Sequence, residues 1–310
     1  MTNEASIRKI VDHILLNACS VNSSGLYNGK AGMALALFEA ARYLKDEYIE
    51  EQVFDLLQEA LVTKTKDISF EDGLGGIGYV LLYLMRNDFI DADFQELFGE
   101  QHQKMLLRIE ELKEKSNSAT NMLRLNYYLA DVQRMFPANR RIKKFIKTIF
   151  EAVEQDLVSQ FSDFGKLDDA NNKILVLLRF ECYLKTVCDC NYSDYSLSLL
   201  NQYADLYRSG RIKSSFPIAY HLEKLGLQEK YGDVIISNKQ FSNQEVLLQH
   251  TSLRNLIEFA QLTGNDQIIT ENDMEESLLK QMPQGAFIAG YEQGLSRLLI
   301  YLTNHKANLL

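Results

Sequence analysis

Two pairs of adjacent acidic residues are the side chains of this sequence best suited to chemistry. Glu71 and Asp72 precede one apolar, helix-like run, and Asp168 and Asp169 precede another. Two carboxylates held about 5–10 Å apart form the catalytic pair of many glycoside hydrolases. Acidic residues at a helix N-terminus can also cap the helix and interact with its dipole. The two pairs therefore predict either a hydrolytic site or helix caps.

One histidine and several polar or aromatic residues stand at similar places. His250 precedes the apolar run TSLRNLIEF, where it can exchange protons near neutral pH or bond to backbone or water at a helix start. If such helix starts gather round one opening, they form the rim of a pocket that suits a peptide or a small molecule. The predicted rim consists of Tyr27, Asn28, Glu71, Asp72, Asp168, Asp169, His250, Arg254, Tyr291 and Glu292.

A repeated segment is expected to position these residues. Residues 29–40 read GKAGMALALFEA, residues 73–84 read GLGGIGYVLLYL, and residues 291–302 read YEQGLSRLLIYL. Aligned in this way, Gly32, Gly76 and Gly294 occupy one slot. Glycine inside a helix costs about 1 kcal/mol against alanine. Its recurrence predicts a close approach between the backbone and a neighbouring helix or ligand.

Helical periodicity dominates the rest of the chain. Amphipathic stripes predict outer helices near 4–18, 48–63, 93–114, 140–160, 193–208, 226–248 and 272–281. More uniformly apolar runs predict inner helices, which need cover on most sides; these begin near 29, 73, 119, 169, 214, 251 and 291. Seven hairpins with a period of about 40–50 residues predict an all-α fold of stacked repeats. Because the first and last repeats are alike, we expect a closed (α/α)7 toroid, one domain over residues 1–310.

One stretch and the overall composition complete the description. YGDVIISNKQF at 231–241 is the least helical part and is expected to be a loop or a short strand pair. The formal net charge of −9 argues against nucleic acid as a partner. No apolar run reaches the roughly 18–20 residues of a membrane span, and the N-terminus does not resemble a signal peptide, so we expect a cytoplasmic protein. The cysteines, Cys19, Cys182, Cys188 and Cys190, lack paired metal-ligand spacing and are expected to be free thiols.

The hairpins with glycine at their inner-helix starts resemble the lanthionine synthetase C-like (LanC-like) family. The matching segments are GLYNGKAGMALAL at 25–37, SFEDGLGGIGYVLLYL at 69–84 and AFIAGYEQGLSRLLIYL at 286–302. The resemblance implies a double-layered toroid of seven helical hairpins. It also implies a zinc ion held by two cysteines and a histidine, which activates a peptide thiol for ring closure.

The sequence departs from the family at those ligands. In the repeat register Ile212 falls where the first cysteine is expected, and Gln249 falls at the second, so that only His250 remains. Isoleucine cannot bind zinc, and glutamine is a poor ligand for it. The sequence therefore predicts a degenerate member of the family with no metal and no cofactor.

A preserved repeat beside a lost metal site favours binding over catalysis. The leading hypothesis is a peptide-binding or scaffold component of a lanthipeptide-type modification pathway. Its partner would be a peptide or a modification enzyme. A carboxylate-dependent hydrolase built on the same toroid and a helical protein-interaction module remain as alternatives.

Overall fold

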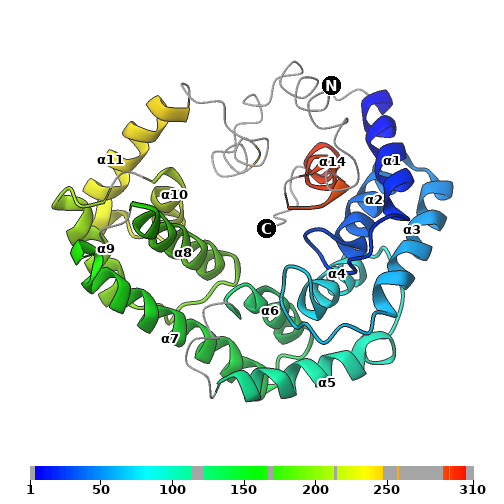
Figure 1. The fold of residues 1–310 in the computed structure, drawn as a ribbon, viewed down its shortest axis with the longest axis horizontal. Helices are drawn as coiled ribbons and strands as arrows, with labels where there is room; N and C mark the ends of the chain where they lie inside the picture. Colours follow the sequence, from blue (N-terminus) through cyan, green and yellow to red (C-terminus); the bar gives the residue numbers. More distant parts are fainter. Residues whose placement is uncertain are drawn as a thin grey trace. The chain divides into compact units, whose positions relative to one another are not determined.

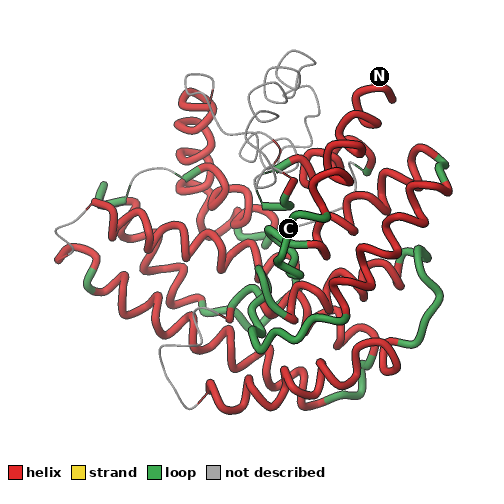
Figure 2. Tube along the Cα trace, turned by 45° about the vertical axis from the view of Figure 1, so that its right-hand side comes forward, coloured by secondary structure: helices red, strands yellow, loops and turns green. Residues whose placement is uncertain are grey.

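The described part of the chain folds into helices joined by loops. A computed structural model describes residues 4–113, 122–166, 170–212, 215–246, 257, 289–292 and 294–304, and these residues contain helices and loops but no strand (Figure 2). The helices are α1 (Glu4–Ala18), α2 (Lys30–Leu44), α3 (Glu47–Leu61), α4 (Leu74–Arg86), α5 (Phe94–Lys113), α6 (Leu125–Met135), α7 (Arg140–Ser162), η2 (Phe164–Lys166), α8 (Ala170–Asp189), α9 (Leu197–Arg208), α10 (Phe216–Lys224), α11 (Gln228–Val246) and α14 (Leu295–Thr303). The all-α prediction is confirmed.

These helices form two compact units. Unit 1 consists of Met1–Glu110 and Thr251–Leu310, and unit 2 is the intervening Glu111–His250. Unit 1 therefore contains both ends of the chain. The assignment of residues 1–310 to a single domain stays a prediction. None of the described helices is both long and apolar enough to cross a membrane.

Unit 1 is built around three helices that are buried on nearly every side. All residues of 31–41 in α2, of 74–84 in α4 and of 295–302 in α14 are buried. Helix α2 packs against α1, α3, α4 and α14, and α14 also packs against α1 (Figure 1). By contrast, α1 and α3 each bury a single stripe, with Ile7, Ile10, Val11 and Ile14 typical of α1. The predicted difference between inner and outer helices is confirmed for these five helices.

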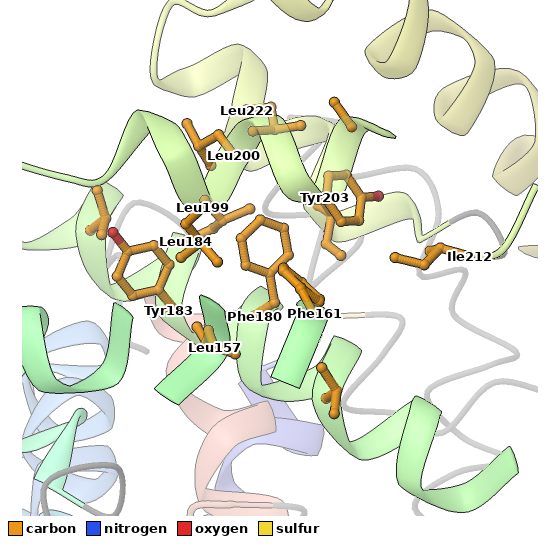
Figure 3. Close-up of a cluster of buried hydrophobic side chains, with 14 of the residues drawn as sticks. Leu157, Phe161, Phe180, Tyr183, Leu184, Leu199, Leu200, Tyr203, Ile212 and Leu222 are labelled. Atoms are coloured by element: carbon orange, nitrogen blue, oxygen red, sulfur yellow. The ribbon is translucent and has the colours of Figure 1, made fainter. Parts of the chain in front are cut away.

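Unit 2 has its own hydrophobic core. Helix α7 packs against α6, α8 and α9, and α10 packs against α8 and α11. Phe180 of α8 lies at the centre, with its ring 5.2 Å from that of Phe161 and 4.8 Å from that of Tyr203 (Figure 3). Leu199 and Leu200 of α9 complete this cluster, which is fully buried. Large aromatic side chains thus join the three successive α-helices α7, α8 and α9.

The expectation of a loop or strand pair at 231–241 is wrong. These residues lie in α11, whose only non-helical backbone angles among the described residues are at Tyr231, with φ −124° and ψ 23°. Tyr231, Val234, Ile235 and Asn238 are buried at the i, i+3, i+4 and i+7 spacing of one helical face. The β-branched residues and Gly232 concealed this periodicity, and the packing of the face decides the outcome.

Helix α8 departs from the expectation for an inner helix. Val176 and Phe180 are buried, but Ile174, Leu175 and Leu178 expose 54, 53 and 52% of their surface. The inference that an apolar run must be covered all round is wrong for this part of the chain. Hydropathy records the side chains that a helix carries, and it does not record whether a neighbour covers them.

Candidate loop cluster at the inner-helix starts

The loops before α2 and α4 fold back and cap their own helices. The amide of Lys30 donates to the carbonyl oxygen of Ser23 at 3.0 Å, and the amide of Leu74 donates to that of Asp67 at 2.9 Å. In both repeats the first helical residue bonds to the carbonyl seven positions earlier. The N-cap residue of α4 is Gly73, which has no side chain with which to cap the helix. Backbone carbonyls satisfy amides that would otherwise lack partners.

The three repeats align in a register different from the expected one. Gly29, Gly73 and Gly294 are the N-cap residues of α2, α4 and α14, and all three have extended backbone angles. Gly294 therefore matches Gly73, three positions away from the sequence alignment with Gly76. The alignment was wrong because the last repeat has one glycine where the others have several, and a single glycine cannot define a register.

In this corrected register the loops are joined by a repeated pair of hydrogen bonds. The amides of Leu26 and Tyr27 both donate to the carbonyl oxygen of Glu71, at 2.9 and 2.8 Å. The amides of Tyr291 and Glu292 both donate to the carbonyl oxygen of Tyr27, at 2.6 and 3.1 Å. In both pairs the donors stand three and two positions before the N-cap of their own helix, and the acceptor stands two positions before the N-cap of the other helix. The same arrangement therefore links α14 to α2 and α2 to α4.

Glycine permits the close packing within each repeat. A Cβ atom on Gly32 would lie 1.9 Å from the carbonyl oxygen of Leu26, and one on Gly76 would lie 2.2 Å from that of Phe70. Both separations are far below a real contact, and in both repeats the carbonyl belongs to the residue six positions earlier. The predicted close backbone approach is confirmed at Gly32 and Gly76, but the closest neighbour is the loop of the same repeat and not, as expected, a neighbouring helix or a ligand.

Aromatic side chains fill the space between the loops. The buried ring of Tyr27 lies 6.5 Å from that of Phe70, edge to face, and 6.2 Å from that of Tyr291. The guanidinium of Arg297 lies 5.2 Å from the centre of the Tyr291 ring, and its Nε donates to the Tyr291 carbonyl oxygen at 3.4 Å. Tyr27 and Tyr291 are therefore structural members of the predicted rim, because their rings are enclosed rather than offered to a ligand.

The remaining described rim residues of unit 1 are accessible. Asn28 and Asp72 are exposed, and Glu71 and Glu292 are half-buried. The side chains of Asn28 and Asp72 make no hydrogen bond or ion pair with the described part of the chain. We call residues 23–28, 67–72 and 289–292 the loop cluster. It carries four acidic residues, Asp67, Glu71, Asp72 and Glu292, and no lysine or arginine.

The other four predicted rim residues lie outside the described residues. These are Asp168, Asp169, His250 and Arg254. The carboxylate separation on which the hydrolase alternative depends is therefore not tested. What the structure brings together is the acidic and aromatic set from the loops before α2, α4 and α14.

Two buried charged residues of unit 1 were missed by the sequence reasoning. Arg297 is 5% exposed in α14, and Glu39 is 4% exposed in α2. Each is a lone charge within an otherwise apolar helical run. That was a usable signal, because a charged side chain is almost never fully buried unless it is paired. Both indeed have partners, which for Glu39 include Tyr83 and Asn304.

The thiols and histidines form no recognisable metal centre in the described ranges. No group of three or more His, Cys, Asp or Glu side chains there could hold a metal ion. Cys188 donates to the carbonyl oxygen of His221 at 3.5 Å, and burial raises the pKa of this thiol to about 12. His221 is buried in α10. All four cysteines are free.

The chain matches no protein-family profile and no curated protein sequence.

Proposed function

We propose that this protein is a LanC-like (α/α)7 toroid that binds a peptide or a partner enzyme without zinc-dependent cyclase chemistry. The repeated loop pattern supports the architectural part of the proposal. Two adjacent amides in the loop before α14 donate to one carbonyl oxygen in the loop before α2, and the equivalent amides before α2 donate to the equivalent carbonyl oxygen before α4. Repeats that contact their neighbours in the same way can be added one after another, as they are in closed rings of helical hairpins.

The loss of the zinc ligands supports a binding role. Ile212 occupies the place expected for the first cysteine, and it is buried in the unit 2 core. An aliphatic side chain cannot bind zinc, so the zinc-dependent activation of a thiol that the family resemblance implies is not expected here. The scaffold can still bind the peptide on which such chemistry is performed.

One observation carries the proposal that the ligand is a peptide. Asp72 and Asn28 present a carboxylate and a carboxamide to solvent, and neither makes a hydrogen bond or ion pair in the described structure. A carboxamide both donates to and accepts from a peptide backbone, and a carboxylate pairs with a basic side chain. The four acidic residues of the loop cluster then favour a basic segment over an acidic one.

Fluorescence anisotropy with two short labelled peptides tests this proposal. One peptide carries lysine at every third position, and the other carries glutamate at the same positions. We expect the lysine peptide to bind more tightly, and Asp72→Asn to weaken it by about fivefold or more. Asp91→Asn, a change at an exposed aspartate of the same unit, is the matched control and should have no effect.

Two results would overturn the proposal. The first is equal binding of the two peptides by the wild-type protein in low salt, where exposed charges are least screened. The second is one tightly held zinc ion per chain in elemental analysis of the purified protein, which would restore a metal-dependent role.

A further inference from the structure

We infer that helix α7 and the segment before it bind the surface of an anionic lipid bilayer. The inference concerns unit 2 alone and does not depend on the proposal for the loop cluster. The surface has two parts. The first, called here the α7 basic face, consists of Arg140, Lys143, Lys144 and Lys147, and the second is the 135–138 segment, which reads MFPA.

Positive charge is concentrated in this part of an acidic chain. The whole sequence has a formal net charge of −9, yet residues 132–150 contain no acidic residue. The basic residues of this stretch are Arg134, Arg140, Arg141, Lys143, Lys144 and Lys147. Exposed charges act over about 8 Å at physiological ionic strength. A surface that approaches this stretch therefore meets its local positive charge rather than the net charge of the chain.

The α7 basic face is one exposed stripe of the helix. Its residues follow the spacing i, i+3, i+4 and i+7, which makes them neighbours over two turns, and all four are exposed. The opposite face, which includes Ile142 and Ile149, is buried in unit 2. Because its apolar side is already covered, α7 can contact a partner only through its polar side.

The protein itself neutralises little of this charge. The side chains of Arg140, Lys143 and Lys144 form no ion pair or hydrogen bond with the described part of the chain, and Lys147 lies 3.7 Å from the exposed carboxylate of Glu151. Like charges at these spacings repel one another, and basic residues in the first turns of a helix oppose its dipole. A negatively charged surface removes both unfavourable interactions, so charge complementarity specifies an anionic partner.

The 135–138 segment favours a bilayer among anionic partners. Met135 exposes 38% of its surface, and Ala138 is also exposed. The α7 basic face begins two residues later, and Arg134 precedes the segment, paired with Asp131 but with half of its side chain exposed. At a bilayer, apolar side chains enter the boundary of the acyl chains while neighbouring basic side chains stay at the phosphates. A nucleic acid backbone or a polyglutamate chain has the charge but no apolar layer beneath it.

Flotation of the full chain with lipid vesicles tests the inference. One set of vesicles is pure phosphatidylcholine, and the other contains about one third phosphatidylserine. We expect at least about tenfold tighter binding to the vesicles with phosphatidylserine, because each basic residue near an anionic surface strengthens binding. The preference should disappear in about 1 M salt, where the Debye length falls to about 3 Å.

Substitutions locate the binding surface. Lys143→Gln combined with Lys144→Gln should weaken binding to the anionic vesicles by about tenfold or more. Lys64→Gln combined with Lys66→Gln removes the same charge from two exposed lysines of unit 1 and should leave binding nearly unchanged. Met135→Gln changes no charge and should weaken binding by about threefold, since it removes apolar surface from the interface. Circular dichroism of each variant shows that its helices are retained.

Several results would overturn the inference. They are the absence of binding to the anionic vesicles, equal binding to the two kinds of vesicle, and equal weakening by the two double substitutions. An unchanged affinity of Met135→Gln would also overturn it, because the contact would then be purely electrostatic. Displacement of the protein from the vesicles by a smaller amount of charge on polyglutamate or duplex DNA would assign the face to an acidic protein or a nucleic acid instead.

Discussion

The side-chain amide of Asn304 donates a hydrogen bond of 3.1 Å to Oε2 of Glu39, although 265 positions separate the two residues. The other carboxylate oxygen of Glu39 accepts a hydrogen bond from the hydroxyl of Tyr83. One buried carboxylate thus connects α2, α4 and the residue that ends α14. Since both of its oxygens have donors, its burial is compensated.

Replacing Glu39 should destabilise unit 1. Glu39→Ala leaves the Tyr83 hydroxyl and the Asn304 amide without their acceptor, so we expect a loss of about 2–4 kcal/mol in the free energy of unfolding. Glu39→Gln should cost less, because its carbonyl oxygen still accepts from Tyr83. Urea unfolding followed by circular dichroism measures both. Glu51→Ala, at an exposed glutamate of α3, should change stability by less than about 0.5 kcal/mol. Equal effects of Glu39→Ala and Glu51→Ala would contradict the assigned role.

Two glycine-to-alanine substitutions should act in opposite directions. In Gly32→Ala the new methyl group would meet the Leu26 carbonyl oxygen at 1.9 Å, so the loop must shift. We expect a net loss of about 1–3 kcal/mol. In Gly99→Ala, within α5, the nearest atom is the mobile end of Gln95 at 3.0 Å, and alanine should stabilise the helix by up to about 1 kcal/mol. Thermal unfolding of the two variants compares them directly. A gain in Gly32→Ala would show that the loop does not need this close approach.

Glu154 should make the free energy of unfolding fall as pH rises. A salt-bridged carboxylate, whose pKa is lowered by folding, has the opposite effect. Burial raises the pKa of this carboxyl above its ordinary value, against the bonds donated by Tyr183 and the Ser196 amide. The unfolded chain therefore loses its proton first as pH rises, and the ionised form costs stability in the folded state. Glu154→Gln should be more stable than the wild type at pH 8. The difference should shrink as pH falls toward about 4, near the ordinary pKa of glutamate.

Unfolding at a series of pH values measures that difference. Glu51→Gln serves as the matched control, and its stability should run parallel to that of the wild type. A difference between Glu154→Gln and the wild type that stayed constant from pH 4 to pH 8 would be incompatible with the raised pKa.

The cysteines should react with alkylating agents in an order set by burial. Cys19 is exposed at the end of α1, whereas Cys188 is buried and its thiol has a pKa of about 12. Because the thiolate is the reactive form, iodoacetamide at pH 8 should label Cys19 first and Cys188 only after unfolding. Mass spectrometry of timed samples, with a sample in urea as the reference, gives the order. Rapid labelling of Cys188 in the folded protein would contradict the packing around α8 and α10.

The amphipathic helices were predictable from the sequence because their stripes are regular and end at polar breaks. The expected 4–18 is α1, 93–114 is α5 (Phe94–Lys113), and 140–160 is α7 (Arg140–Ser162). The exposure of Ile174, Leu175 and Leu178 in α8 was not predictable, since a helix with leucine on several sides has the same sequence whether or not a neighbour covers it. The kink of α11 at Tyr231 similarly depends on tertiary packing.

The candidate site was predictable in part. Recurrent glycine before apolar helices pointed to the loops that hold Asn28 and Asp72. The bonds that join those loops run between backbone atoms, such as the Tyr291 amide and the Tyr27 carbonyl, and any residue type could make them. Such bonds do not depend on residue type, so they could not be recognised in the sequence. The sequence alignment at Gly294 was therefore wrong by three positions.

The placement of α14 against α1 and α2 has a consequence for how the protein is made. A ribosome releases the chain from its N-terminus, so the middle of the chain, which forms unit 2, emerges complete while α2 still lacks its last neighbour. Until residue 304 has left the ribosome, the carboxylate of Glu39 lacks the hydrogen bond that Asn304 donates. Nascent chains stalled just before residue 289 should therefore be far more sensitive to protease in their first hundred residues than in the segment that follows.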